Sequence, residues 1–217
     1  MALSEPKTAK GRATRERILL AAAALVVAKG AVAISLEDVC DRAGASRSQL
    51  YHYFDDKADL IRAVVGATAD AVLGAQAGHL DQLDTWAAIA AWFEAMVSLQ
   101  EAREARGGCP IGSLVGQLAE RDEGARVALA ASLDRWQRHL TDGLLRMRTR
   151  GELRPDVDPG RLATATMASL QGGLLLTQAR RDPDQLRTAL DGAMAILRAA
   201  AAPTINTPRR DEGGQAA

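Results

Sequence analysis

The spacing of the apolar residues constrains the fold of this chain more than any other feature. Alanine and leucine dominate the apolar positions, which recur at intervals of three and four residues. β-Branched residues do not alternate with polar ones, so the signals that predict strands are nearly absent. The 217-residue sequence therefore predicts an all-α fold.

Glycine, proline and N-cap residues divide this pattern into separate helices. The expected helices cover about 12–29, 35–43, 46–53, a stretch from 55 or 56 through 72, 83–106, a short stretch from 109, 123–150, 159–180 and 183–201. The last residues, 203–217, are polar and lack a core-forming pattern. We expect that tail to be disordered.

Composition limits the kinds of partner and compartment. Lys plus Arg and Asp plus Glu both number 27, so any contact with nucleic acid must come from a local patch rather than from bulk positive charge. The two cysteines, Cys40 and Cys109, are too few for a disulfide framework, and no cysteine–histidine cluster predicts a metal site. We expect a cytoplasmic protein with neither a metal nor a cofactor.

A secretory signal peptide is an alternative interpretation of the N-terminus. Residues 1–17 are basic, 18–28 form an apolar run, and Ala31-Val32-Ala33 resembles a cleavage site. The run consists mostly of small or branched residues and closes with Lys29-Gly30, which favours an ordinary helix instead. No apolar run approaches the roughly 18 residues that a bilayer span requires, so no membrane contact is expected.

The segment 35–57 carries the strongest functional signal. Two short predicted helices are separated by a Gly-Ala turn, and each has its own capping box, Ser35 with Asp38 and Ser46 with Gln49. This arrangement is typical of a helix-turn-helix, whose second helix enters the major groove by its N-terminal end.

The second helix of this pair is expected to present polar and aromatic side chains outward. Leu50 and Phe54 lie four residues apart and would take its inner face. Arg47 has the geometry to read guanine and Gln49 to read adenine. The candidate DNA contacts are Ser35, Ser46, Arg47, Ser48, Gln49, Tyr51, His52, Tyr53 and Lys57.

Two further features bear on this interpretation. The arm 1–17 holds five basic and two acidic residues, a net charge of 5 − 2 = +3 that would support phosphate contacts. The alternative is that the rings only cover the surface of a small bundle. Three of the seven aromatic residues lie within 51–54, however, and packing alone does not explain that clustering.

The stretch AGASRSQLYHYFDDKADLIRAV, residues 43–64, resembles the signature of the TetR family of one-component transcriptional regulators. It has that family's small-residue turn, serine, aromatic pair, phenylalanine, lysine and leucine in order, within a resemblance that covers about 12–65. Ser48 departs from the pattern, since the family often has glycine or alanine there.

The resemblance implies a DNA-binding domain, a larger helical ligand-binding and dimerisation domain, and repression relieved by a small molecule. It also implies that Ser46, Arg47, Gln49, Tyr51, His52, Tyr53 and Lys57 match positions that commonly touch DNA. We accordingly expect an arm and helix-turn-helix domain over 1–55, an effector-binding and dimerisation domain over 56–202, and the tail over 203–217.

An effector pocket is expected in the second domain. Four of the seven aromatic residues, Trp86, Trp92, Phe93 and Trp136, lie there with apolar neighbours at helical spacing. Taken one at a time, each of these residues could belong to the ordinary core. As a group they lie where the resemblance implies an apolar pocket, and we expect a flat, apolar or aromatic effector there. The candidates for its few polar groups are Gln117, His139, Gln171 and Thr177. The full set of candidate effector residues also includes Trp86, Trp92, Phe93, Met96, Cys109, Leu114, Trp136, Leu140, Leu144 and Met167.

The two cysteines have different expected roles. Cys109 follows Gly107-Gly108 and precedes Pro110, at a helix N-terminus that would favour its thiolate. One hypothesis is a thiol that senses oxidants or electrophiles, and the alternative is a small buried residue at a turn. Cys40 lies on the inner stripe of its helix and is expected in the core.

The last two predicted helices carry more apolar residues than a hairpin needs for itself. The resemblance implies that the hairpin meets its copy in a four-helix homodimer interface, and a twofold dimer predicts a near-palindromic operator. The candidate interface residues are Leu170, Leu174, Leu186, Leu190, Met194 and Leu197.

Two other classes of protein are weaker alternatives. HExxH, GxSxG, GxGxxG and GxxxxGK[ST] are absent and the three histidines are scattered, which disfavours an all-α enzyme. A nonspecific architectural DNA-binding protein would need more Arg and Lys on the reading helix. The sequence predicts a transcriptional regulator that binds double-stranded DNA, a repressor released from its operator by a small apolar or aromatic effector.

Overall fold

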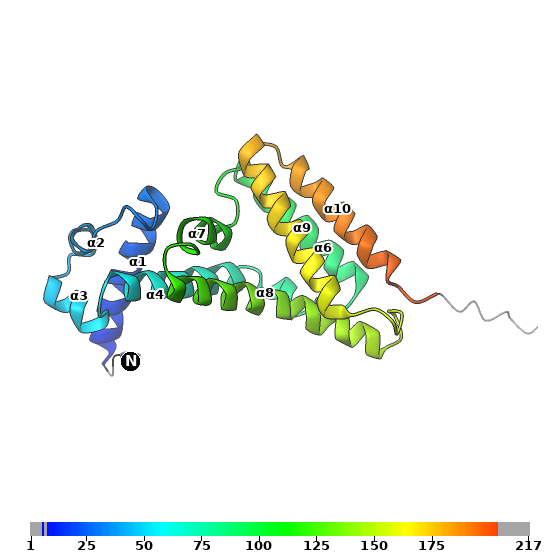
Figure 1. The fold of residues 1–217 in the computed structure, drawn as a ribbon, viewed down its shortest axis with the longest axis horizontal. Coiled ribbons are helices and arrows are strands. Elements are labelled where there is room, and N and C mark those ends of the chain that lie inside the picture. The colour runs from blue at the N-terminus through cyan, green and yellow to red at the C-terminus, as the bar shows by residue number, and fades with distance from the viewer. Residues whose placement is uncertain (1–5, 7, 204–217) are drawn as a thin grey trace, which may run out of the picture.

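Helices account for every named element of the computed structural model, which describes residues 6 and 8–203. In order they are α1 (Ala9–Lys29), α2 (Leu36–Ala43), α3 (Arg47–Tyr53), α4 (Lys57–Gly74), α5 (Ala77–Leu80), α6 (Trp86–Ala102), α7 (Pro110–Leu118), α8 (Glu123–Thr149), α9 (Pro159–Arg180) and α10 (Asp184–Ala199) (Figure 1). The predicted all-α fold is confirmed. Of the predicted disordered tail, all but Pro203 lies outside the described residues, as do Lys7 and 1–5 of the basic arm.

Three details differ from the expected boundaries. Helix α1 begins at Ala9, three residues early, because the Thr8 side chain caps it by accepting a hydrogen bond from Gly11 N at 3.1 Å. The short α5 was not predicted. Helix α6 ends at Ala102 rather than near 106, because Glu104 and Ala105 adopt φ values of 51° and 57°, which no helix continues.

The first three helices form a small bundle at one end of the molecule (Figure 1). The apolar run at 18–28 is the middle of α1, and its buried members Ile18, Ala22 and Leu25 belong to the hydrophobic core. Helix α1 packs against α2, α3 and α4. Leu50 and Phe54 are buried, so α3 is anchored by the two residues that the sequence assigned to its inner face.

Both predicted capping boxes are present. Asp38 N donates to Ser35 Oγ and Ser35 N donates to Asp38 Oδ2, each at 3.0 Å. At α3, Gln49 N donates to Ser46 Oγ at 3.2 Å and Ser46 N donates to Gln49 Oε1 at 2.9 Å. Gly44, with φ 57°, provides the left-handed turn between the two helices.

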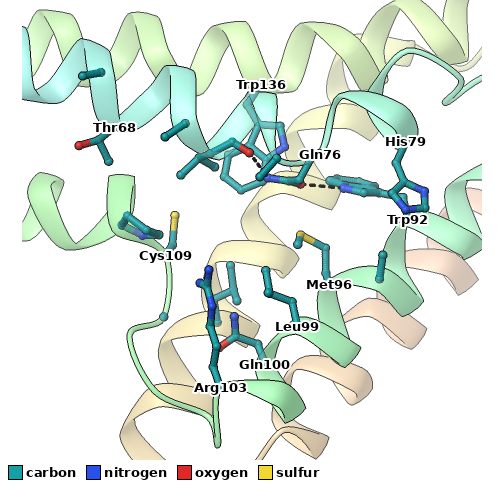
Figure 2. A pocket seen from close by; sticks show the side chains of 18 of the residues that line it. Thr68, Gln76, His79, Trp92, Met96, Leu99, Gln100, Arg103, Cys109 and Trp136 are labelled. Carbon is teal, nitrogen blue, oxygen red and sulfur yellow. Dashed lines mark hydrogen bonds between the residues drawn. The ribbon is translucent and has the colours of Figure 1, made fainter. Parts of the chain in front are cut away.

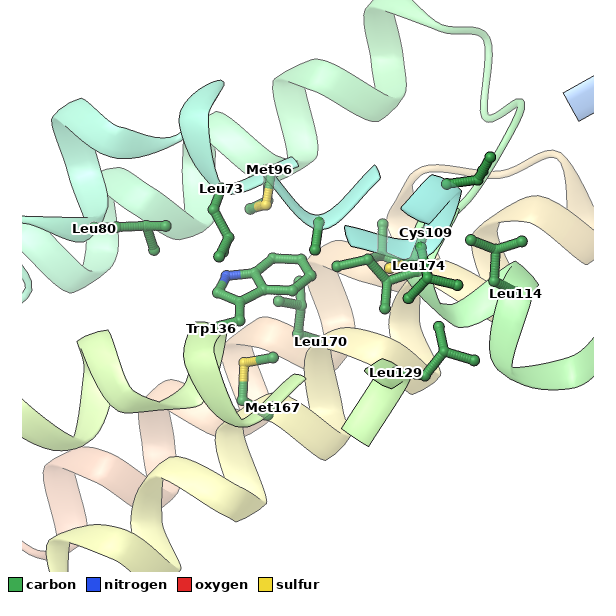
Figure 3. Close-up of a cluster of buried hydrophobic side chains, with 14 of the residues drawn as sticks. Leu73, Leu80, Met96, Cys109, Leu114, Leu129, Trp136, Met167, Leu170 and Leu174 are labelled. Carbon is green, nitrogen blue, oxygen red and sulfur yellow. The ribbon is translucent and has the colours of Figure 1, made fainter. Parts of the chain in front are cut away.

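The long helices α4 and α8 run side by side from this bundle into the second half of the molecule, where α6 packs with the α9–α10 hairpin (Figure 1). The core there gathers Trp136 of α8 with Met167 and Leu170 of α9 (Figure 3). Gly143 brings α8 against the backbone at Leu83, because a Cβ at this position would overlap the Leu83 carbonyl oxygen.

An ion pair links the end of α1 to the start of α2. Lys29 Nζ lies 3.0 Å from Asp38 Oδ1, and this hydrogen bond, with those from Ser35, lowers the pKa of Asp38 from 3.8 to about 2. A carboxyl group whose pKa is lowered by folding stabilises the folded state above its unfolded pKa, and that stabilisation disappears as the pH falls through its folded pKa.

We therefore predict that Asp38→Asn removes part of the acid sensitivity of the fold. The wild-type melting temperature should fall more steeply than that of the variant between pH 3.8 and about 2, because only the wild type must protonate a paired carboxylate. Thermal unfolding followed by circular dichroism at several pH values measures the difference. Parallel curves for the two proteins across that window would contradict the assignment.

Candidate DNA-reading helix and ligand cavity

Helix α3 presents an uninterrupted polar and aromatic surface. Arg47, Ser48, Gln49, Tyr51 and His52 are exposed. Because Leu50 and Phe54 are buried beneath it, the seven-residue α3 is held in place and presents this face outward from the bundle. No acidic residue occurs within α3. The surface therefore has the donors, acceptors and rings that major-groove recognition requires.

The contacts of the individual side chains refine this surface. The guanidinium of Arg47 lies 3.6 Å from Glu37 Oε2, but both side chains are largely exposed, so this pair is weak and can be exchanged for another partner. Tyr53 is half-buried, and its ring packs edge to face against the His52 ring, with 4.8 Å between the ring centroids. Ser35 and Ser46 are committed to helix caps, although both remain exposed.

Lys57 has a structural contact that the sequence did not predict. Its Nζ donates to the Val32 carbonyl oxygen at 2.8 Å and so ties the start of α4 to the α1–α2 loop. The residue as a whole is half-buried, and this hydrogen bond engages its amine. A phosphate contact by Lys57 stays a prediction, one that would require the amine to share or exchange this partner.

A cavity of about 530 Å³ lies between α1, α4, α6 and α8 (Figure 2). Four of the predicted effector residues line it: Trp92, Met96, Cys109 and Trp136. The remaining lining residues are Leu20, Ala23, Ala67, Thr68, Ala71, Val72, Ala75, Gln76, His79, Ala95, Leu99, Gln100, Arg103, Gly108, Pro110 and Leu174.

The other predicted effector residues lie elsewhere. Leu114, Leu140, Leu144 and Met167 are buried in the core, as is Phe93. Outside the cavity, Trp86 carries Arg198 over its ring at 5.0 Å, and His139 Nδ1 lies 3.9 Å from Asp81 Oδ1. Thr177 is buried and accepts a hydrogen bond from Leu186 N at 3.1 Å, while Gln171 is half-buried beside Gly112. None of these side chains lines the cavity, because helical spacing identifies an inward face but not whether that face meets core or cavity. A contact between any of them and an effector stays a prediction.

Two glutamines were missed by the sequence analysis. Gln76 is buried, accepts a hydrogen bond from Trp92 Nε1 at 2.9 Å and donates to the Val72 carbonyl oxygen at 2.9 Å (Figure 2). Gln100 is buried as well, on the inner face of α6. Glutamine is mostly an exposed residue, so the sequence offered little reason to expect either of them at a cavity. For Gln100 there was one signal, its spacing of four residues from Met96 and eight from Trp92 on the same helix.

The two cysteines occupy different environments. Cys109 is the N-cap of α7, where its Sγ accepts a hydrogen bond from Gly112 N at 3.3 Å, and it lines the cavity. The predicted position at a helix N-terminus is confirmed, and the reactivity of the thiol stays a prediction. Cys40 is buried as expected, and burial raises the pKa of its thiol.

One side chain connects the body of the protein to the helix-turn-helix. Gln117, near the end of α7, accepts a hydrogen bond at its Oε1 from Ala31 N at 2.7 Å. Its Nε2 donates to the carbonyl oxygen and the hydroxyl of Ser113, both at 3.2 Å. Gln117 therefore bridges α7 and the α1–α2 loop, and its predicted contact with an effector stays a prediction.

A capped helix pair with an exposed second helix, followed by a helical body around an apolar cavity, defines a helix-turn-helix DNA-binding regulator. Comparison with known families is more specific. Residues 18–64 match the model described as bacterial regulatory proteins, tetR family, and residues 85–193 match the tetracyclin repressor-like C-terminal domain. The chain therefore belongs to the TetR family of transcriptional regulators, which are not enzymes.

Individual relatives agree with this assignment. An HTH-type transcriptional regulator of Mycobacterium tuberculosis is 30% identical over 182 residues, covering 77% of this chain and 86% of its own. The transcriptional regulator AcuR of Cereibacter sphaeroides is 31% identical over 163 residues, 74% of each chain. The structure of a TetR transcriptional regulator from Chloroflexus aurantiacus superposes with a TM-score of 0.74 at 25% identity, covering 89% of this chain and 98% of that one.

None of the helices in the described part of the chain combines the length and the apolar character that crossing a membrane demands.

We predict that Arg47→Ala weakens specific DNA binding by about 1–3 kcal/mol per lost bidentate base contact. The experiment first selects a cognate site from random DNA and then measures affinity by fluorescence anisotropy at fixed salt. Arg138→Ala, an exposed arginine on α8, is the matched control and should bind like the wild type. Equal affinities for wild type and Arg47→Ala would remove Arg47 from the reading surface.

Proposed function

We propose that this regulator is a repressor that binds a near-palindromic operator as a homodimer and is released by a small, mainly apolar or aromatic effector in the cavity. The observation that carries the proposal is the position of α4. Helix α4 follows α3 and also lines the cavity. A ligand in the cavity that displaces α4 would therefore displace α3 as well.

Helix α4 begins at Lys57, immediately after the loop that follows α3. Its later turns supply Thr68, Ala71 and Val72 to the cavity wall. An effector that binds better to a state with α4 displaced would stabilise a different placement of α3. The effector can shift the balance only by the difference between its affinities for the two states.

Helix α7 supports a second route. Its N-cap, Cys109, lines the cavity, and Gln117 near its other end holds the α1–α2 loop through Ala31 N. A ligand that moves the start of α7 would therefore also act on the loop that precedes the helix-turn-helix. The proposed domains, 1–55 for DNA and 56–202 for effector and dimerisation, would be coupled through these two helices.

The outer face of the α9–α10 hairpin is the proposed dimer interface. Five of the residues first expected there, Leu170, Leu174, Leu186, Leu190 and Leu197, are buried within their own subunit, and Met194 is half-buried. The apolar side chains that remain outward are Leu175, Leu176 and Ile196, which are 66%, 42% and 51% exposed. We therefore transfer the proposed interface from the inner to the outer face.

Glycines support this outer face. Beyond its chain neighbours and the backbone of its own helix, a Cβ at Gly172 or Gly192 would meet no atom of the described residues within 4 Å, so both positions are open toward an approaching helix. Gly172 lies three residues before Leu175, and Gly192 lies four residues before Ile196, so each glycine shares a face with an exposed apolar residue. Gly173, by contrast, lets α9 approach Leu186 and Ala189 within the hairpin.

The cavity supports the choice of effector. Its wall is mainly alanine, leucine and methionine, with the indole rings of Trp92 and Trp136. Its volume of about 530 Å³ falls within the range of small-molecule sites, which are mostly apolar with a few placed polar groups.

The function is tested by operator release. A thermal-shift screen of small molecules identifies ligands, and mobility shift with the selected operator then measures the affinity with and without each ligand. The proposal expects ligands that stabilise the protein to lower its operator affinity. Ligands that bind in the cavity yet leave the operator affinity unchanged would contradict it.

We predict that Gln117→Ala reduces the coupling between effector and operator several-fold, within the usual range of about 1–3 kcal/mol for such coupling. The measurement is the ratio of operator affinities with and without a saturating ligand. Ser113→Ala is the matched control, since it removes one partner of Gln117 and leaves the bond to Ala31 N. If Gln117→Ala and Ser113→Ala both keep the wild-type ratio, α7 is not a route of coupling.

We predict that Leu175→Glu converts the dimer to monomers in sedimentation velocity at micromolar concentration, because it would bury an unpaired charge at the centre of the interface. Val127→Glu, at an exposed valine of α8, should leave the association unchanged. A Leu175→Glu protein that sediments as the wild-type dimer would place the interface elsewhere.

A further inference from the structure

The charges around the cavity are of one sign. Among its lining residues, all within the described part of the chain, there is neither Asp nor Glu. Arg103 contributes a guanidinium and His79 an imidazole. The wall is therefore apolar with basic groups and no compensating carboxylate.

Arg103 is available to a ligand. It is the C-cap of α6, and its side chain extends toward the cavity beside Gln100 (Figure 2). It forms no ion pair with any residue that the structure describes, whereas Arg106 in the same loop lies 3.5 Å from Glu104. Arg103 is exposed, so its guanidinium is hydrated and stays accessible to an anion that arrives at the edge of the cavity.

Gln100 adds a buried group without a partner. The residue is only 1% exposed, and its Oε1 accepts no hydrogen bond from the described residues. The amide lies next to Arg103, with its nitrogen directed into the cavity (Figure 2). The unpaired Oε1 is an acceptor, so a hydrogen-bond donor on the ligand would recover the free energy that its burial costs, whereas the amide nitrogen is the atom that can donate to a carboxylate.

The N-terminus of α7 contributes a second positive feature beside Arg103. Gly108, Cys109 and Pro110 form part of the cavity wall, so this nine-residue helix begins at the cavity. The partial positive charge at a helix N-terminus favours an anion. It acts together with Arg103, which lies on the same α6–α7 connection.

We infer that the effector is an organic acid with an apolar body. Its carboxylate meets the Arg103 guanidinium and the Gln100 amide, and its body lies among Trp92, Met96 and Leu99. An amine of the same shape meets the positive charge of Arg103 and is rejected. This inference rests on the proposed function, since it specifies the chemistry of the ligand in the same cavity.

Matched probes test the inference. Naphthalene acetate, naphthalene acetamide and naphthylethylamine share one body and carry an anionic, a neutral and a cationic group. Decanoate, decanamide and decylamine repeat the comparison with a flexible body. Binding to the full-length protein is followed by intrinsic tryptophan fluorescence, because two of the three tryptophans line the cavity.

The acid of at least one series is expected to bind about tenfold or more tightly than its amide, with no measurable binding of the amine. Arg103→Gln should remove this preference by weakening the acid about tenfold while leaving the amide within about twofold. Arg106→Gln is the matched control on the same loop and should keep the preference.

Gln100→Glu gives a sharper outcome, because it places a negative charge at the proposed carboxylate site. It should abolish acid binding and admit the amine, and a wild-type circular dichroism spectrum and melting transition would show that it folds. Equal binding of acid and amide, an acid preference that survives Arg103→Gln, or no binding of any probe would overturn the inference.

The failure of this inference is distinguishable from the failure of the proposed function. If neutral or cationic ligands bind and release the operator, the acid chemistry is wrong and the effector-controlled repressor stands. If the acid binds with the expected preference and the operator affinity does not change, the acid site stands and release by this effector is wrong.

Discussion

The burial of Leu50 and Phe54 is the interaction on which the rest of the structure depends. Both side chains are buried in the core of the N-terminal bundle, and the Arg15 guanidinium covers the Phe54 ring at 5.3 Å. A helix of seven residues is too short to be stable alone, so tertiary packing must hold α3 in place. Truncating a buried phenylalanine costs about 3–5 kcal/mol, and here it would also release the orientation of the reading surface.

That constraint explains how a chain without net charge acts on DNA. The groups proposed to contact DNA are local: the outward side chains of α3 and the exposed residues of α1. Their placement relative to the body depends on α4, on the Lys57 contact to Val32 and on the Gln117 contact to Ala31. The two hydrogen bonds end on backbone groups of the same α1–α2 loop, so this loop is where movements of the body would reach the DNA-binding bundle.

Local signals made the N-terminal part predictable from the sequence. Serine N-caps with Asp38 and Gln49 three residues later, and a leucine–phenylalanine pair four apart, each depend on a few neighbouring residues. The same kind of reasoning was weaker for the cavity. Trp92 and Met96 line it while Phe93 on the same helix does not, because the packing of α6 against α5 and α10 decides which inward residue meets empty space.

Five of the residues expected at the dimer interface are buried within their own subunit for a related reason. Leu170 and Leu174 share an apolar face of α9, but that face is used within the subunit, and Leu175 and Leu176 on the next face are the exposed ones. A periodic pattern cannot distinguish an intramolecular from an intermolecular partner. Gln76 and Gln100 were missed because only the three-dimensional structure reveals that they are buried beside a cavity.

The central claim, that the outward face of α3 meets the operator and leaves it when the effector binds, is tested most directly by photo-cross-linking. A photoreactive amino acid at Tyr51 should cross-link to operator DNA, and a saturating effector should abolish the cross-link. The same amino acid at the exposed Val127 of α8 should give none in either condition. DNA cross-linked from Val127 but not from Tyr51, or an effector-independent cross-link at Tyr51 with an operator that is otherwise released, would contradict the account.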